Sequence, residues 1–317
     1  TQGYSSAASD VYKRQGYTEV GFSRISVNPS LSIIYKLNYA WRFTVHASYK
    51  ERYGEMTDLY DRPYQTDYRN SVWNCGILPV YRQQLYSVYG EYKNTAREFF
   101  ATVNLTHNRE WYNRIYEQRI ENGQIQRVSL PLSNHGSGYT VKSTLSKGFY
   151  DLGLKTSLLA LLNISKAEQI SGGQRLPYQY RLMRLEPKVI WTPNRHWETS
   201  YQTDIRYGGS KIGERTRLVP LWNVTQQVQL SYIFSPIEAS FSVDHYHNDV
   251  NEDQSVNAVF ADFSVLWKSR RLQITATATN LFDKRTYGYT RYASLESYTS
   301  WVRIRPREFL VAIRYRL

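Results

Sequence analysis

Residues 41–50 read Trp-Arg-Phe-Thr-Val-His-Ala-Ser-Tyr-Lys, and this alternation of apolar and polar side chains decides the fold. Successive side chains of a β-strand point to opposite faces of a sheet. One face therefore carries Trp41, Phe43, Val45, Ala47 and Tyr49, while the intervening polar residues share the other. Residues 308–317, at the other end of the sequence, alternate in the same way. The pattern predicts strands that meet apolar surroundings on one side and water on the other.

The same period of two recurs along the chain and predicts about thirteen strands. Many of these segments exceed the roughly 5–6 residues of a typical soluble strand. Most reach the roughly 9–11 residues that a tilted transmembrane strand needs, whereas the longest mostly apolar run, residues 158–164, is too short for a membrane-spanning helix. The segments lie near residues 20–37, 41–51, 80–93, 97–110, 134–148, 152–166, 178–192, 196–207, 219–234, 237–248, 255–268, 271–282 and 303–317.

The connections between these segments alternate in length. Short ones lie at residues 38–40, 94–96, 150–151, 193–195, 235–236 and 269–270, and long polar ones at 52–79, 111–133, 167–177, 208–218, 249–254 and 283–302. Short turns at one rim and long loops at the other are typical of outer-membrane barrels, whereas a β-sandwich mixes loop lengths. The sequence thus predicts an all-β, antiparallel, up-and-down transmembrane β-barrel.

The composition agrees with two membrane interfaces. The chain has 29 Tyr and 8 Trp, but only 2 Met and 1 Cys. Tyr and Trp suit positions where one end of the ring is apolar and the other is wet. The formal net charge is +13, and the basic excess lies in the predicted strands and short turns rather than in the long loops. Because Cys75 is alone, an internal disulfide is excluded.

A motif near the C-terminus adds a family resemblance. The run Asn280-Leu281-Phe282-Asp283-Lys284, followed by Tyr287, resembles the penultimate strand of TonB-dependent outer-membrane receptors, and residues 306–317 resemble their closing strand. The resemblance covers residues 17–317 and implies a C-terminal fragment with about 13 strands of an expected 22, with the plug domain missing upstream. The chain departs from the family at Leu317, where the family usually has Phe.

The resemblance also implies a function. It implies TonB-dependent uptake of a large nutrient, such as an iron chelate, cobalamin or an oligosaccharide, across the outer membrane of a Gram-negative bacterium. The implied partners are outer-membrane lipid, the chain's own plug domain, the TonB energy-coupling complex, the barrel-insertion machinery and a possible surface lipoprotein. No cofactor is expected. Residues 1–16 contain the adapter-like stretch 5–15 and are expected to be a non-native or disordered remnant; the alternative is an ordinary polar tail.

Two sets of side chains are candidates for ligand contacts. Strand arginines should face the lumen because charge on a lipid-facing position costs about 2–4 kcal/mol at the midplane. A basic lumen would attract anionic ligands, with contact to a plug or to water as the alternative; its members are Arg42, Arg206, Arg314 and Arg316. Aromatic rings in the long loops could stack on a ligand or form the interfacial girdle; these are Tyr60, Tyr64, Tyr68, Trp73, Trp111, Tyr112, Tyr289 and Tyr292.

Other functions find less support in the sequence. His245 and His247 at strand spacing could bind a metal, but an ordinary polar rim explains them better. No hydrolase elbow, P-loop or His-Glu-x-x-His motif is present, and His107 and Asp244 have no Ser partner, so no enzyme is expected. The basic charge is spread over many strands, which argues against nucleic acid. A plug-less porin or adhesin barrel is the alternative to a receptor.

Overall fold

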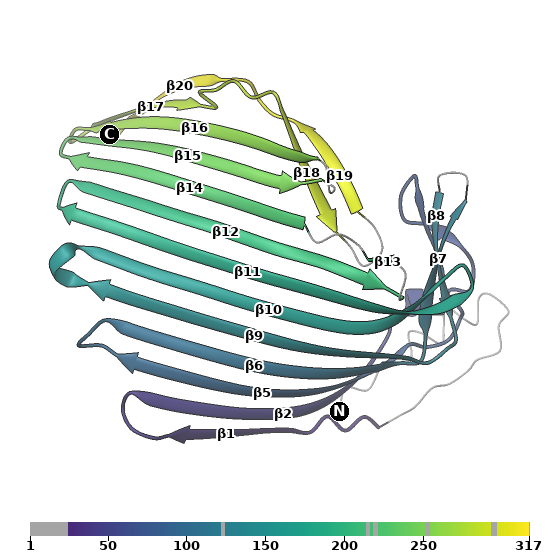
Figure 1. The fold of residues 1–317 in the computed structure, drawn as a ribbon. Helices are drawn as coiled ribbons and strands as arrows, with labels where there is room; N and C mark the ends of the chain where they lie inside the picture. The colour runs from purple at the N-terminus through teal and green to yellow at the C-terminus, as the bar shows by residue number, and fades with distance from the viewer. Residues whose placement is uncertain are drawn as a thin grey trace.

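The computed structural model describes residues 25–121, 124–213, 216–217, 221–250, 254–292 and 297–316. Figure 1 shows a wide, curved sheet crossed by long strands, and the elements are all β apart from two short 3-10 turns. Thirteen strands form the wall in chain order, each antiparallel to the next. They are β1 (Ser30–Lys36), β2 (Trp41–Tyr53), β5 (Val80–Asn94), β6 (Phe99–Tyr112), β9 (Asn134–Phe149), β10 (Leu154–Ser171), β11 (Gln174–Asn194), β12 (Trp197–Ile212), β14 (Leu221–Phe234), β15 (Ile237–Asp249), β16 (Ser255–Lys268), β17 (Leu272–Thr279) and β20 (Glu308–Tyr315).

All thirteen predicted strands are confirmed, so the sequence pattern gave the right wall. The expected boundaries differ at the first segment, where the strand begins at Ser30 and residues 20–24 lie outside the described part. The expected loop at 167–177 is wrong. There β10 and β11 continue to a two-residue turn at Gly172 and Gly173, both with positive φ. Glycine adopts this backbone freely, which permits a tight hairpin in place of a loop.

The register keeps the two faces of the wall separate from strand to strand. Trp41 pairs with Tyr92, Val45 with Val88, and Val88 in turn with Leu105. Residues in register share a face. We call the face that carries Trp41, Val45, Val88 and Leu105 the apolar face. The opposite face, which carries Arg42 and its register neighbours, is the polar face.

The wall has almost no apolar core. Among the described residues only six apolar side chains are buried, and two of these are alanines. Aliphatic and aromatic side chains of the apolar face are instead widely exposed: Val103 is 43% and Leu105 47% exposed. Soluble monomers rarely expose so continuous an apolar surface. The stability of the wall therefore depends on its hydrogen-bond ladders and on what covers the apolar face.

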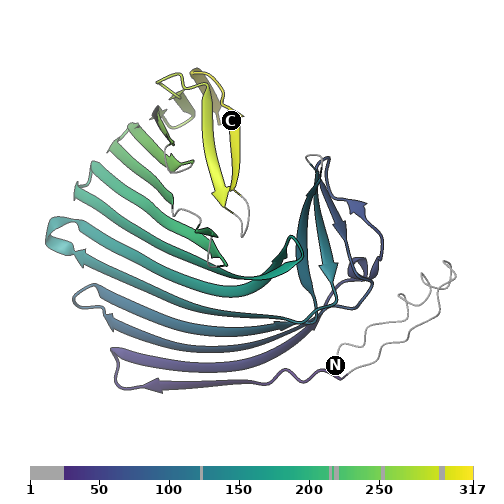
Figure 2. The ribbon, with the colours of Figure 1, turned by 45° about the vertical axis from the view of Figure 1, so that its right-hand side comes forward.

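The described strands do not close into a complete barrel. In the described part of the chain, β1 pairs only with β2, and β20 only with β17. Figure 2 shows the resulting open, curved wall, with the two edge strands far apart along its arc.

Four further strands, missed by the sequence analysis, occupy the two longest loops. They are β3 (Tyr64–Gln65), β4 (Asn70–Trp73), β7 (Ile115–Glu121) and β8 (Gln124–Leu130), together with the 3-10 turn η1 (Met56–Leu59). We call these elements the long-loop layer. In addition, β13 (Thr216–Arg217) extends the loop after β12, and β18 (Thr286–Tyr292) pairs with β19 (Ser297–Arg303) in a separate hairpin. The second 3-10 turn, η2 (Tyr150–Leu152), joins β9 to β10.

Candidate functional site

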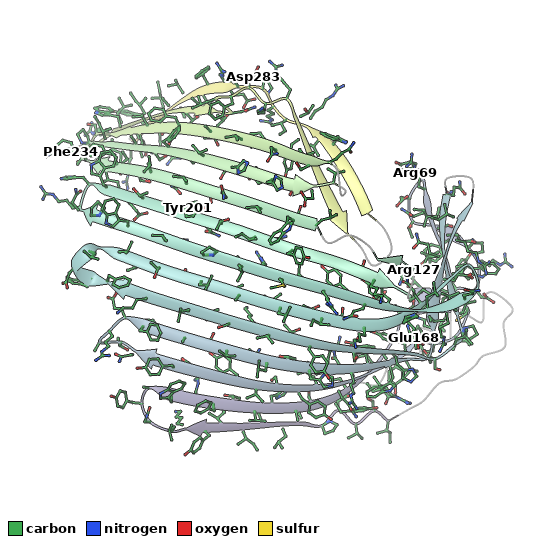
Figure 3. The ribbon with its side chains drawn as sticks, viewed as in Figure 1. Arg69, Arg127, Glu168, Tyr201, Phe234 and Asp283 are labelled. Carbon is green, nitrogen blue, oxygen red and sulfur yellow. The ribbon has the colours of Figure 1, made fainter. Side chains whose placement is uncertain are left out.

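The long-loop layer is a small sheet attached to one end of the wall. Strand β4 runs parallel to β8, β8 is antiparallel to β7, and β7 meets the end of β10 at Ile170 and Ser171. Its core contains Ile115, which is 0% exposed, together with the buried Val128 and Ile170. In Figure 3, Arg69 marks the far end of this layer and Phe234 the opposite, short-turn end of the wall. The loops therefore form a built platform at one rim.

The predicted aromatic residues of the first loop fall into three groups. Tyr60 and Tyr64 pack edge-to-face with ring centroids 6.1 Å apart. The Trp73 indole Nε1 donates a hydrogen bond to Asp61 at 3.2 Å, which fixes that ring. Tyr68 is 78% exposed and lies 5.3 Å from the Arg69 guanidinium. Their role in ligand binding stays a prediction.

Trp111 and Tyr112 are consecutive and lie on opposite faces. Trp111 belongs to the apolar face, in register with Arg82 and His135. The Tyr112 hydroxyl donates to Glu110 at 2.7 Å on the polar face. The same carboxylate accepts from three more groups, so it is fully satisfied: the Tyr81 hydroxyl at 3.0 Å, Gln83 at 3.1 Å and Asn108 at 2.9 Å.

Tyr289 and Tyr292 lie on β18, but their side chains are outside the described residues. The hairpin itself is anchored through Tyr287. The Tyr287 ring packs on Tyr246 at 5.4 Å and on Phe260 at 6.3 Å, and its hydroxyl accepts a hydrogen bond from Asn248 at 2.8 Å. Tyr246 and Phe260 belong to the polar face, since their neighbours His245 and Val259 are in register on the apolar face. The β18–β19 hairpin therefore covers part of the polar face.

Tyr116, an aromatic residue of the second long loop, belongs to a further cluster. Its ring lies between two guanidinium groups, with Arg127 3.7 Å and Arg114 4.9 Å from the ring centroid. Arg114 is in turn paired with Asp58 at 2.8 Å. Burial raises the pKa of the Tyr116 hydroxyl, and the two arginines oppose that shift. Tyr116 lies opposite Ser129, so Arg127, opposite Gln118, approaches the ring diagonally, and the sequence did not indicate this register.

Arg42, Arg206 and Arg314 have polar-face register, and the first two are paired with carboxylates. Arg42 forms an ion pair with Glu91. Arg206 pairs with Asp204 at 2.6 Å, and the same carboxylate receives two hydrogen bonds from Arg184 at 2.9 and 3.0 Å. Farther along the wall, Arg314 lies opposite Gln273, and the Arg316 amide donates to the Arg271 carbonyl at 2.8 Å. Whether they face a lumen that attracts anions stays a prediction.

The family motif forms a corner between the wall and the β18–β19 hairpin. The buried Asn280 has a φ of 51°, and its side-chain amide donates to the carbonyl oxygens of Lys284 at 2.8 Å and Arg305 at 2.9 Å. Its side-chain oxygen accepts from the Lys284 amide at 3.0 Å. One Asn side chain thus joins the outgoing and returning chains. The Leu281 amide, by contrast, donates to the Ala261 carbonyl at 2.8 Å.

Asp283 completes the same corner, while Phe282 is 55% exposed beside it. Arg285 donates to the Asp283 carboxylate, as does the Arg307 amide at 3.0 Å. The Arg285 hydrogen bond, and then the Arg307 amide, lower the pKa of Asp283 below its ordinary value. The Arg307 amide contact therefore joins the entry to β20 to this corner.

No group of three or more His, Cys, Asp and Glu side chains that could hold a metal ion occurs among the described residues. The two histidines at strand spacing lie on the apolar face and contact other partners: His245 contacts Gln226 at 3.4 Å, and His247 contacts Asn257 at 2.9 Å and Asp249 at 3.1 Å. No helix of the described chain is long and apolar enough to cross a membrane.

Comparison with known proteins shows a fold rather than a sequence family. No protein-family model matches the chain, and neither does any curated protein. The FrpB iron transporter from Neisseria meningitidis is similar over 83% of this chain and 44% of its own, with a TM-score of 0.51 and 8% identity. The wall has a β-barrel fold. The FyuA ferric yersiniabactin uptake receptor from Yersinia pestis matches 92% of this chain and 50% of its own, with a TM-score of 0.49 and 8% identity. The chain thus spans about half, or less, of these structures.

Proposed function

We propose that this chain is the membrane-embedded wall of a TonB-dependent outer-membrane receptor that takes up a large nutrient, such as an iron chelate, cobalamin or an oligosaccharide. The observation that carries the proposal is an exposed apolar face that continues across a wall with almost no apolar core. Alternating strands with one apolar face are what a lipid-embedded barrel requires. In lipid, moreover, every backbone group must be paired, which the antiparallel ladders provide.

The height of the apolar face fits a bilayer. Two aromatic pairs bracket it on β12 and β14: Trp197 with Tyr232, at 4.7 Å, near the short turns, and Tyr207 with Trp222, at 4.6 Å, near the long loops. Ten residues separate the members on each strand, which is about 33 Å of strand. With a tilt of about 40° this becomes about 25 Å of height, the height of the apolar band in outer-membrane barrels.

The receptor proposal includes parts beyond the described wall. A sheet in lipid cannot keep a free edge, and β1 and β20 each have one edge without a partner among the described residues. We therefore propose that further strands complete a closed barrel of 22 strands and that a plug domain lies inside it. The TonB complex, the barrel-insertion machinery and a surface lipoprotein remain parts of the same proposal.

The long-loop layer is the proposed ligand platform. Tyr60, Tyr64, Tyr68 and Trp73 lie in it, and rings held by neighbouring groups can stack on a chelate or a sugar at little entropic cost. FrpB is an iron transporter, which favours an iron chelate among the three ligand classes.

The test uses the complete gene product that contains this chain. We expect heat-modifiable migration of the outer-membrane protein, and uptake of one of the three ligand classes that is lost when TonB is deleted. Uptake that continues without TonB would favour the plug-less porin, and membrane insertion without any uptake would favour the adhesin. Recovery of the product as a soluble monomer would contradict the barrel itself.

A further inference from the structure

On β2, β5, β6 and β9 the apolar face changes character within a short distance of the long-loop rim. The register arranges its residues in rows about 7 Å apart, two residues per step along each strand. The first row is wholly aliphatic, the second mainly aromatic and the next two polar. In order toward the long loops, they are Val45–Val88–Leu105–Val141, Ala47–Tyr86–His107–Tyr139, Tyr49–Gln84–Arg109–Ser137 and Glu51–Arg82–Trp111–His135.

The first two rows form a groove with a volume of about 390 Å³. His107 stacks between Tyr139, with ring centroids 4.3 Å apart, and Tyr86, at 6.4 Å. The His107 ring is oriented by contact of its Nδ1 with the Gly138 carbonyl oxygen at 3.0 Å. Val88 and Leu105 provide the aliphatic lining. The groove is thus a preformed apolar channel within the face that we assign to lipid.

The next two rows border a second cavity of about 480 Å³, lined by Arg82, Gln84, Trp111 and His135 among others. Arg109 lies in the first of these two rows, next to the row of His107. It is exposed, and no hydrogen bond or ion pair joins its guanidinium to another described residue. His135 is also exposed, whereas Arg82 already pairs with Glu51 at 3.2 Å. The Arg109 guanidinium therefore lies in the row next to an apolar channel.

We propose that these two cavities together bind one phosphate-bearing acyl lipid of the outer leaflet. The acyl chain would lie in the groove against Val88, Leu105 and the stacked ring of His107. The phosphate would contact Arg109, with His135 and Arg82 beside it. This inference rests on the proposed function, which places the long-loop rim at the cell surface. A guanidinium binds phosphate through paired hydrogen-bond donors. A free anion would not occupy the apolar groove next to Arg109, whereas an acyl chain would.

Another part of the same rim gives a contrast within the molecule. On β15 and β16 the apolar face carries His247, Asp249 and Asn257 near the long loops. These groups contact one another at 3.1 and 2.9 Å. No described arginine stands in register with them on β14 to β16. The described β14–β16 part of the rim therefore lacks the guanidinium groups that β5 and β6 place beside the groove.

The test measures lipid retained by the full chain in detergent, by native mass spectrometry. The probes are lipid A, its dephosphorylated form and a diacylglycerol, which has acyl chains but no phosphate. We expect lipid A to be retained about tenfold more than the other two. Arg109→Glu should reduce its retention to their level, and Tyr139→Ala should weaken all three acyl probes. Arg271→Glu makes the same charge change at the short-turn rim and should have no effect.

Equal retention of lipid A and its dephosphorylated form, or unchanged retention in Arg109→Glu, would overturn the inference. Competition by inorganic phosphate alone would mean a free-anion site and would overturn it as well. Heat-modifiable migration of each sample separates the two proposals. A heat-modifiable chain without phosphate preference contradicts only the lipid site, whereas a chain that never becomes heat-modifiable contradicts the membrane wall and the lipid site together.

Discussion

The wall and the long-loop layer are both β-sheets, but different surroundings stabilise them. The wall exposes Val103 and Leu105 and buries few apolar side chains. Each of its strands is apolar on one face only. The long-loop layer buries Ile115 completely and adds ion pairs such as Arg114 with Asp58. A period of two therefore identifies strands that have one face against a continuous apolar phase. Short strands that pack around a few residues carry no such pattern.

Placing a charge at mid-height of the wall should have the largest effect. Val103 lies between Phe99 and His107 on the apolar face, and Thr106 lies nearby on the polar face. We expect Val103→Arg to destabilise the inserted chain by about 3 to 4 kcal/mol and to reduce its amount in the outer membrane. Thr106→Arg should be tolerated. Equal loss in both variants, measured by membrane fractionation and urea unfolding, would mean that the two faces do not differ as described.

The core of the long-loop layer should respond differently. Ile115→Ala removes its one fully buried side chain, and we expect a loss of about 3 kcal/mol that is confined to the layer. Hydrogen exchange should become faster in β7 and β8 while the ladders of β5 and β6 stay protected. Exposed Ile120 on the same strand provides the control, since Ile120→Ala should change little. Loss of protection throughout the wall would show that the two regions are one cooperative unit.

Much of the wall could be predicted from the sequence, and the reason is physical. A strand between lipid and water must alternate, and residues 41–50 do so without interruption. The β10–β11 hairpin extends above the apolar band, where no such constraint acts, so its strand residues looked like a loop. The Gly172–Gly173 pair was the available indication of a tight turn.

The candidate site was less predictable. The sequence identified the aromatic residues of the loops but not which groups each of them contacts. The contact of Tyr116 with Arg127 joins two strands, and its partner could not be identified without their register. Likewise, the Arg109 site depends on rows across four strands, which no single segment reveals.

The corner at Asn280 connects the wall to the β18–β19 hairpin. Asn280→Ala removes three side-chain hydrogen bonds and places Ala at a φ of 51°, so we expect a loss of about 2 kcal/mol. The effect should appear as faster exchange at Lys284 and Arg307, with β5 and β6 unchanged. Asn280→Asp, which keeps the acceptor toward the Lys284 amide, should restore part of the protection. If Asn280→Ala leaves exchange unchanged, the corner is held by other contacts.

The smallest expected effect is a pH dependence of the same corner. The pKa of Asp283 is lowered, so its stabilising effect is present above the unfolded-state pKa of about 3.9 and is lost as pH falls through the lower folded-state value. The protection of the Arg307 amide in wild type should exceed that in Asp283→Asn at pH 6. The two should converge by about pH 2. A constant difference across that range would contradict the role of the ionised carboxylate.

The alternation of the two faces can be measured directly with spin labels at successive positions 102–107, in a Cys75→Ala background and with the barrel in lipid. The account predicts that labels at 103, 105 and 107 are relaxed by oxygen, which dissolves in the bilayer. Labels at 102, 104 and 106 should respond instead to a water-soluble nickel complex. A uniform response along the strand, or water-soluble access at 103 and 105, would contradict the assignment of the apolar face to lipid.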